Sequence, residues 1–239
     1  MSLTGTPPMQ KIYRYIKQLS SLLLCLVVFT GQAQEKKIIE KPVLPKVKLY
    51  NGFTVQVDAA SLVSSAISDG TTHSIEGAVQ FNLKKKYYPV IELGYAGADK
   101  ISNDNVGFKT NGLFERLGFD ISMLKQKPNS KPTNNLFTVG LRLGMSNFTY
   151  DISNVVITDN YWGGTERQDF SNMNTTKLWL EIVVGIKVEV YKNIFLGWNV
   201  RKKILSQPTT GEVYPWYVPG YGINTSGNWD FNYIVGYKF

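Results

Sequence analysis

Apolar and polar residues alternate one by one along the C-terminal segment. Its apolar or aromatic members are Trp229, Phe231, Tyr233, Val235, Tyr237 and Phe239. Polar or small residues lie between them, with Ile234 as the single exception. Because successive side chains of a β-strand point to opposite faces, a period of two predicts a strand with one continuous apolar face.

The same alternation recurs upstream. It covers residues 53–58, 75–83, 91–96, 113–123, 137–146, 176–190 and 194–201. With the C-terminal segment, this predicts about eight strands. The weakest pattern is that of 113–123, because Glu115 falls on the face shared by Leu117 and Phe119. We expect Glu115 at a rim of the sheet or after a β-bulge.

The connections between these strands alternate in length. Short ones occupy 84–87, 125–135 and 191–193, and long ones occupy 62–73, 97–107, 151–173 and 206–226. Short turns at one end and long loops at the other are typical of outer-membrane barrels with periplasmic termini. The pattern therefore predicts an all-β fold, a closed antiparallel up-and-down transmembrane β-barrel.

The second face of the predicted strands is charged. Its charged members are Asp58, Glu76, Glu92, Asp120, Arg142, Glu181, Lys187, Glu189, Arg201, Lys203 and Asp230. Unpaired charges in a soluble protein's apolar core carry a large desolvation cost, whereas side chains of both signs can pair inside a narrow barrel. We therefore expect a lumenal lattice of ion pairs and an apolar exterior. A soluble periplasmic β-sandwich or β-barrel is the alternative.

The N-terminus has the layout of a secretory signal peptide. In order, it carries the basic residues Lys11, Arg14 and Lys17, the apolar run 19–29, and the small residues Gly31 and Ala33. We expect 1–33 to be removed between Ala33 and Gln34, with 1–8 upstream of the true start. The apolar run is shorter than the about 20 residues of a transmembrane helix, so an uncleaved anchor is the weaker alternative.

Cleavage would change the composition of the chain. Three basic residues and no acidic ones lie in 1–33, so the net charge would fall from +8 to +5. The single cysteine, Cys25, would also be lost, which leaves no disulfides or thiolate metal ligands. Residues 34–50 contain several lysines and two prolines and predict an extended periplasmic arm before a barrel at 51–239. The basic excess is not clustered as in nucleic-acid-binding proteins.

Three segments resemble a known family. They are Tyr50 to Gly52, Gly140 to Tyr150 and Tyr161 to Gly164, and they are similar to a Bacteroidetes family of uncharacterised outer-membrane β-barrel proteins. More broadly, the chain resembles small eight-stranded OmpA-type barrels. The resemblance implies an outer-membrane location in a Gram-negative bacterium, with contact to outer-membrane lipid, and implies no specific activity.

The final aromatic residues also carry a resemblance. A chain that stops on Phe, with an aromatic residue at the third position and an apolar residue at the fifth position from its end, resembles substrates of the barrel-assembly machinery. The expected assembly signal comprises Phe231, Tyr233, Val235, Tyr237 and Phe239.

Residues suited to catalysis are few. The single histidine, His73, is followed by Ser74, but adjacent strand residues point to opposite faces and would not converge. A lumenal pair of carboxylates for acid–base chemistry and an oxygen-only calcium site in 99–104 are alternatives with weaker support. We expect no enzymatic activity, no cofactor and no metal site; an outer-membrane enzyme acting on lipid or peptide is the alternative.

Aromatic residues in the long connections are the candidate binding surface. They are Tyr161, Trp162, Trp216 and Tyr217. Exposed aromatic clusters often mark interaction sites, here for an extracellular glycan or protein. The alternative is that these rings pack over the barrel mouth. The sequence therefore predicts an outer-membrane barrel with a structural, adhesive or ligand-binding role, too narrow for a general porin.

Overall fold

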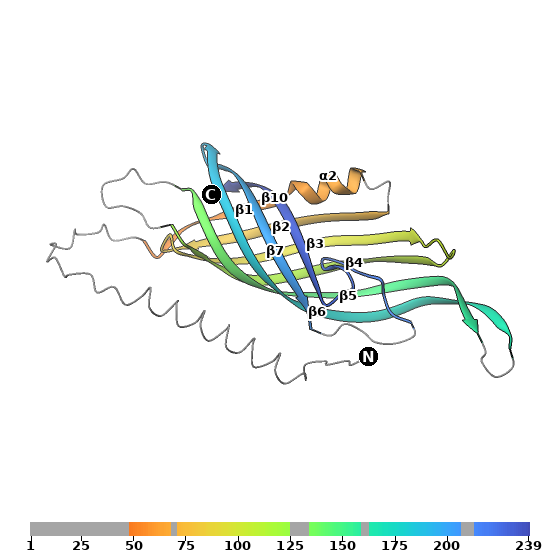
Figure 1. Ribbon diagram of the computed structural model, residues 1–239. Helices are drawn as coiled ribbons and strands as arrows, with labels where there is room; N and C mark the ends of the chain where they lie inside the picture. Colours follow the sequence, from red (N-terminus) through yellow and green to blue (C-terminus); the bar gives the residue numbers. More distant parts are fainter. Residues whose placement is uncertain (1–47, 68–70, 125–133, 159–162, 207–212) are drawn as a thin grey trace, which may run out of the picture. The chain divides into compact units, whose positions relative to one another are not determined.

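Eight antiparallel strands close into a β-barrel in the computed structural model, which describes residues 48–67, 71–124, 134–158, 163–206 and 213–239. In ring order they are β1 (Tyr50–Asp58), β2 (Thr72–Leu83), β3 (Tyr87–Ile101), β4 (Gly107–Ser122), β5 (Leu136–Thr158), β6 (Thr165–Tyr191), β7 (Ile194–Leu205) and β10 (Gly227–Lys238) (Figure 1). The predicted closed antiparallel barrel of eight strands is confirmed. The expected signal peptide, its cleavage site and residues 34–47 of the expected arm lie outside the described residues.

The two faces of the barrel wall differ in chemistry. Along β5, buried and exposed side chains alternate, so that Arg142 is buried while Leu141 and Leu143 are exposed. The same alternation runs through β4, β6 and β7. Large apolar side chains therefore cover the outside of the ring, and polar side chains fill much of the inside. No helix among the described residues has both the length and the apolar character needed to cross a membrane.

The expected bulge near Glu115 is absent from β4. The pairing of β4 with β3 and with β5 continues without a register shift. Glu115 is exposed on the outer face and pairs with Met145, and the next outward residue on β5 is the polar Asn147. The bulge was therefore a wrong prediction, and Glu115 lies close to the end of the apolar surface.

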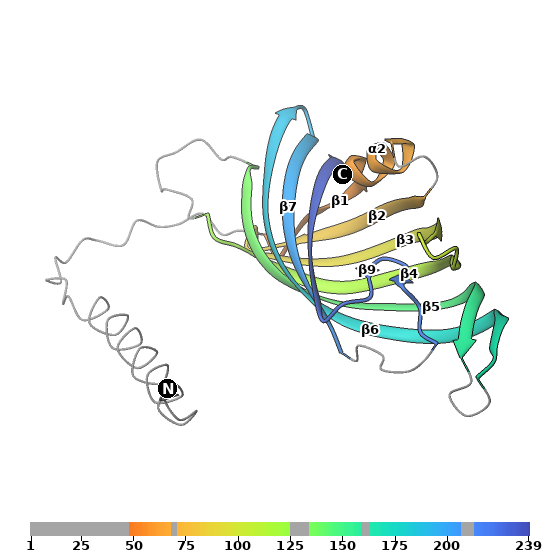
Figure 2. The same ribbon diagram turned by 45° about the vertical axis from the view of Figure 1, so that its right-hand side comes forward.

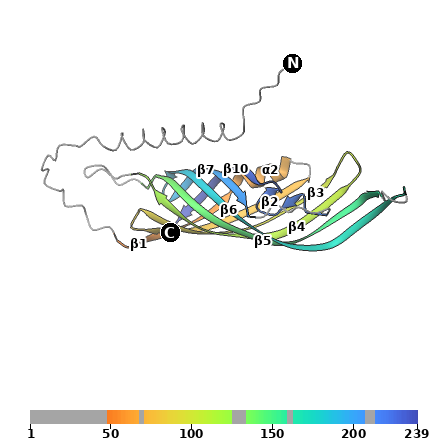
Figure 3. The ribbon, with the colours of Figure 1, turned by 60° about the horizontal axis from the view of Figure 1, so that its bottom comes forward.

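Two of the four connections predicted to be long loops are mostly strand. β3 and β4 leave only 102–106 between them, and β5 and β6 continue far beyond the region of apolar alternation (Figure 3). The prediction failed because most residues of 151–154 and 163–172 are polar and the apolar residues Val155 to Ile157 are consecutive, which removes the hydrophobic period of two while the backbone ladder continues.

The other two long connections contain small elements. α2 (Ala59–Ile67) follows β1 directly, and the side chain of Asp58 accepts a hydrogen bond from the amide of Ala60 (3.0 Å), as a helix N-cap does. The connection from β7 to β10 contains a two-stranded hairpin, β8 (Tyr217–Val218) and β9 (Gly222–Ile223). This hairpin packs inside the mouth of the barrel, because Val218 and Tyr221 belong to its buried aromatic cluster.

The ring closes at a short seam between β1 and β10. Residues Thr54 to Asp58 pair with Lys238 to Ile234, and β1 pairs with β2 as far as Val57 opposite Gly77. Beyond Asp58 the chain turns into α2, which lies beside the ends of β2 and β10 (Figure 2). Between β2 and β10, the wall is thus completed by β1 at the short-turn end and by α2 at the opposite end.

Candidate functional site: a charged lumen and a cavity at the seam

Glu92 of β3 lies at the centre of the lumenal charges. Its carboxylate contacts three arginines from three other strands: Arg142 at 2.9 Å, Arg201 at 3.0 Å and Arg116 at 3.2 Å. All four side chains are buried. The alternation of each strand turns these residues inward, and ring closure brings them together.

Arg116 extends this network in two directions. It contacts Glu76 at 2.6 Å and Glu181 at 2.8 Å, and it donates a 2.7 Å hydrogen bond to the carbonyl oxygen of Gly220 in the β8–β9 hairpin. The hairpin is therefore tied to the lattice by a buried guanidinium. Arg116 was not among the residues predicted for the lumen. The sequence alternation does place it there, because Glu115 and Leu117 on either side of it both lie on the outer face.

Arg142 links the lattice to the short-turn half of the lumen. It binds both carboxylate oxygens of Asp120, at 2.7 and 2.9 Å. Gln80 donates to Asp120 at 2.7 Å, and Lys187 donates to Gln80 at 2.8 Å. Gly118 provides space for this arrangement, since a Cβ there would collide with Cδ of Arg142.

Ten of the eleven predicted lattice residues fall into three groups. Those that the structure brings into one network are Glu76, Glu92, Asp120, Arg142, Glu181, Lys187 and Arg201. Lys203 and Asp230 form a separate ion pair of 2.7 Å. Asp58 is buried at the end of β1, where it accepts hydrogen bonds from Asn232 and from the amide of Tyr233.

The prediction for Glu189 was wrong. This residue is partly exposed near the short-turn end, where it accepts hydrogen bonds from Asn134 and from the amide of Asn193. The β6–β7 pairing shifts register between Glu189 and Tyr191. The pairing is regular through Glu189, so this side chain keeps the inward phase of β6, but it lies at the end of the strand and bonds residues near the turn instead of the lattice.

The aromatic residues of the β8–β9 connection pack against the barrel. Trp216 and Tyr217 are partly buried against the cluster that contains Phe108, and the Trp216 ring meets the Phe108 ring edge to face at 6.0 Å. Burial raises the pKa of Tyr217 to about 12, and it also raises the pKa of Tyr221. This placement matches the alternative in which these rings pack over the barrel mouth. Tyr161 and Trp162 lie outside the described residues.

The structure does not bring His73 and Ser74 together as a catalytic pair. The ring of His73 packs against that of Tyr95 at 5.9 Å, and the backbone of Ser74 is bonded to the Ser65 hydroxyl. Asp99 of the calcium alternative pairs with Lys109 at 3.4 Å. Within the described ranges, no group of three or more metal-ligating side chains is arranged to hold an ion.

A cavity of about 510 Å³ opens beside the seam. Its walls come from α2, the start of β2, the first half of β10 and the β8–β9 hairpin. The lumenal residues Arg116 and Lys203 form its inner side, and Asp58 and Asn232 also line it. It is therefore a polar chamber that joins the edge of the barrel wall to the lattice.

The fold and these contacts define a closed eight-stranded β-barrel with a buried lattice of ion pairs. The chain belongs to the family described as Domain of unknown function (DUF6048), which matches residues 14–239. A comparison with curated proteins finds no match. The crystal structure of Neisserial surface protein A (NspA) is similar at 13% identity and a TM-score of 0.42, over 80% of this chain and 100% of that chain. The barrel topology described above rests on the strand pairing of this chain alone, and the expected Bacteroidetes origin stays a prediction.

Proposed function

We propose that this chain is an integral outer-membrane barrel with a sealed lumen, and that it has a structural or ligand-binding role without catalysis. The observation that carries the proposal is the inverted distribution of side chains around a closed ring. Leu117, Leu141 and Leu180 are exposed on the outer face, while Arg116, Arg142 and Arg201 are buried inside.

A bilayer is the solvent that suits this distribution. Soluble monomers rarely expose contiguous apolar surfaces beyond a few hundred Å², because apolar surface in water is unfavourable by roughly 25 cal/mol per Å². Hydrocarbon in turn requires that backbone polar groups be paired, which a closed ring achieves without free edges. In the described part of the chain, neighbouring strands pair their backbones all around the ring except beside α2.

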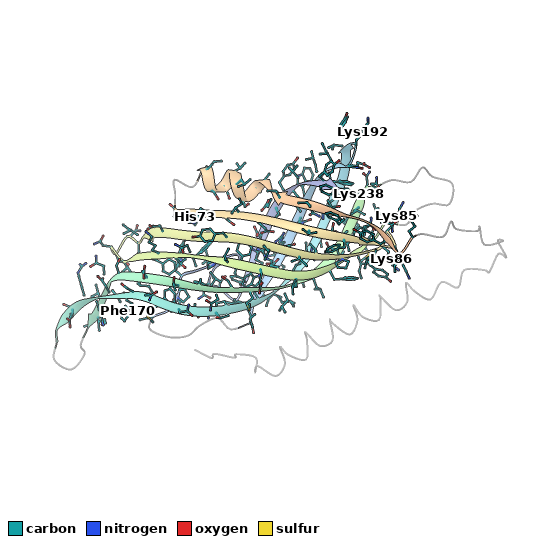
Figure 4. The ribbon with its side chains drawn as sticks, turned by 180° about the vertical axis from the view of Figure 1, so that it is seen from behind. His73, Lys85, Lys86, Phe170, Lys192 and Lys238 are labelled. Carbon is teal, nitrogen blue, oxygen red and sulfur yellow. The ribbon has the colours of Figure 1, made fainter. Side chains whose placement is uncertain are left out.

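Both ends of the outer surface carry residues typical of a membrane interface. Trp198 and Trp229 are each 66% exposed, although indoles are usually at least partly buried in soluble proteins. Lys85, Lys86, Lys192 and Lys238 gather at the short-turn end, opposite His73 (Figure 4). Lysines beside an apolar belt suit the phosphate layer of the periplasmic leaflet.

The contents of the lumen favour a barrel that does not conduct ions. Arg116, Arg201 and Glu181 are fully buried side chains in its centre, and the β8–β9 hairpin occupies one mouth. An eight-stranded barrel has an interior just wide enough for side chains. We therefore propose a structural role in the membrane or a binding role at its surface. The binding role includes contact of the long β5–β6 hairpin with an extracellular glycan or protein.

Membrane fractionation tests this proposal. We expect the protein in the outer-membrane fraction, in a form that migrates differently on a gel before and after boiling. Its mass should correspond to a chain that starts at Gln34. In planar bilayers, the purified protein should show no stable conductance. A soluble periplasmic protein would overturn the membrane assignment, and a steady channel would overturn the sealed lumen.

A further inference from the structure

The barrel wall is interrupted between β2 and β10. Residues 72–76 of β2 pair only with β3, and residues 227–233 of β10 pair only with β7. The strand that would lie between them ends at Asp58, and α2 takes its place (Figure 2). The strand ladder of the ring therefore has an opening here, and α2 spans it.

Side chains of this region satisfy part of both strand edges. The Ser65 hydroxyl of α2 accepts from the amide of Ser74 at 2.8 Å, and its single proton is shared between the carbonyl oxygens of Ser61 at 2.7 Å and Ser74 at 3.1 Å. On the other edge, the amide of Tyr233 donates to Asp58 at 3.2 Å. α2 contacts both β2 and β10 across this opening, and none of its residues is fully buried. The cavity of about 510 Å³ lies in this opening and has a size typical of small-molecule sites.

The charges that line the cavity do not balance. Two of the three carboxylates have cationic partners: Glu76 contacts Arg116 at 2.6 Å, and Asp230 contacts Lys203 at 2.7 Å. The third, Asp58, is 4% exposed and contacts no arginine or lysine among the described residues. Asp58 is instead held by three N–H donors, from Ala60, Asn232 and Tyr233, and a cationic ligand would add the charge partner that these neutral donors do not supply.

Asn232 adds a second acceptor at the same place. It is 6% exposed and lines the cavity, and its amide nitrogen donates to Asp58 at 2.6 Å. This bond fixes the orientation of the amide, and its oxygen has no hydrogen-bond partner within the described part of the chain. A carboxylate and a buried amide oxygen without a partner therefore lie side by side in the wall of the cavity. A protonated amine has three donors and a positive charge, which complements both groups.

Apolar side chains surround the outside of the opening. Leu62 and Val63 of α2 are exposed on one side, and Trp229 and Phe231 of β10 are exposed on the other. From these observations we propose that the opening binds an amphiphile with an ammonium head group. The head group lies against Asp58 and Asn232, and the alkyl chain leaves sideways between α2 and β10. This inference rests on the proposed membrane location.

Native mass spectrometry of the purified full-length barrel tests the inference. The probes are lysophosphatidylethanolamine, lysophosphatidylglycerol and lysophosphatidylcholine with the same acyl chain. We expect at least fivefold stronger retention of the ethanolamine lipid, because only its head group carries an ammonium that donates hydrogen bonds. Free phosphoethanolamine should compete poorly, since it lacks the alkyl chain. Equal competition by free phosphoethanolamine would overturn the sideways route, and equal retention of the three lipids would overturn the ammonium site.

Two variants locate the site. Asp58→Asn keeps a side chain that can cap α2 but removes the charge, and it should reduce ethanolamine-lipid retention to the level of the glycerol lipid. Asp99→Asn is the matched control, because Asp99 is an exposed carboxylate already paired with Lys109, and its retention should equal that of the wild type. Should Asp58→Asn fail to insert, Ser64→Trp fills the exposed side of the cavity and should also abolish the preference.

The outcomes separate this inference from the proposed function. A barrel that fractionates with the outer membrane but retains the three lipids equally refutes the ammonium site alone. Retention that survives both Asp58→Asn and Ser64→Trp places the lipid elsewhere and also refutes it. A protein that never reaches the outer membrane refutes the proposed function first.

Discussion

The wall formed by β3 to β6 and the seam formed by β1, α2 and β10 complete the same barrel by different means. In the wall, β5 pairs with β6 from Leu136 to Thr158, with two local register shifts, and the inward arginines connect neighbouring strands. At the seam, β1 pairs with β10 only from Thr54 to Asp58. The wall is held by a long ladder and a lattice of charges, whereas the seam depends on few contacts.

Aromatic packing reinforces the seam at its short-turn end. The rings of Phe53 and Phe239 are stacked at 5.0 Å, and the amide of Phe239 donates to the carbonyl oxygen of Phe53 at 2.9 Å. Tyr237 meets Phe239 edge to face at 4.8 Å. The strand ladder that closes the ring is therefore shortest beside the cavity, and the proposed function predicts that the seam governs both insertion and access.

The largest expected effect comes from breaking the seam. Changing Tyr237 and Phe239 together to serine removes the stacked rings and should prevent closure, because an open barrel leaves unpaired backbone groups in hydrocarbon, at several kcal/mol each. We expect loss of the protein from the outer-membrane fraction. The control changes Val156 and Ile157 to serine in the exposed β5 extension and should insert normally. Normal insertion of the seam variant would show that closure does not need these rings.

The second effect concerns the lattice of the wall. Arg142→Leu leaves Glu92 and Asp120 with a missing partner and should lower the free energy of unfolding by about 3–5 kcal/mol. Lys109→Leu breaks an exposed pair with Asp99 and should cost about 0–1 kcal/mol. Unfolding by urea in lipid vesicles compares the two. Equal midpoints would contradict a lattice that stabilises the lumen.

A smaller effect tests how α2 replaces a strand. Ser65→Ala removes the hydroxyl that bonds both backbone groups of Ser74 and should cost about 1–2 kcal/mol. Faster hydrogen exchange of the Ser74 amide should accompany this loss. Ser64→Ala is the matched control on the same helix, and its exchange should not change. An unaffected Ser74 amide in Ser65→Ala would mean that the strand edge is protected by another group.

The smallest effect tests the outer face of the wall. Glu115→Leu replaces an exposed carboxylate near the end of the apolar surface and should raise the free energy of unfolding by at most about 1 kcal/mol. The same unfolding assay in vesicles applies, with Glu92→Gln in the lattice as the contrasting variant. A destabilisation by Glu115→Leu of about 2 kcal/mol or more would reveal a polar partner for this residue.

The number of strands, and the face of the barrel wall to which most side chains point, could be predicted from the sequence. The alternation of Leu141, Arg142 and Leu143 assigns each side chain to a face, because that assignment follows from backbone geometry within one strand. The same local rule gave Glu189 the inward phase of β6 but could not show that it bonds residues near the turn, away from the lattice. It also gave no warning that β5 continues to Thr158 and that β6 begins at Thr165, since this part of the ladder has no hydrophobic period of two.

The tertiary structure alone decided which inward charges meet. Arg116 reaches Glu76, Glu181 and Gly220 only because the ring closes and the β8–β9 hairpin folds into its mouth. At the point where β1 ends and α2 begins, Asp58 has no arginine or lysine partner among the described residues. These outcomes depend on contacts between segments more than 100 residues apart in sequence, such as Arg116 with Gly220 and Asn232 with Asp58. Local periodicity carries no information on such contacts, because they are set by strand length, tilt and closure of the whole ring.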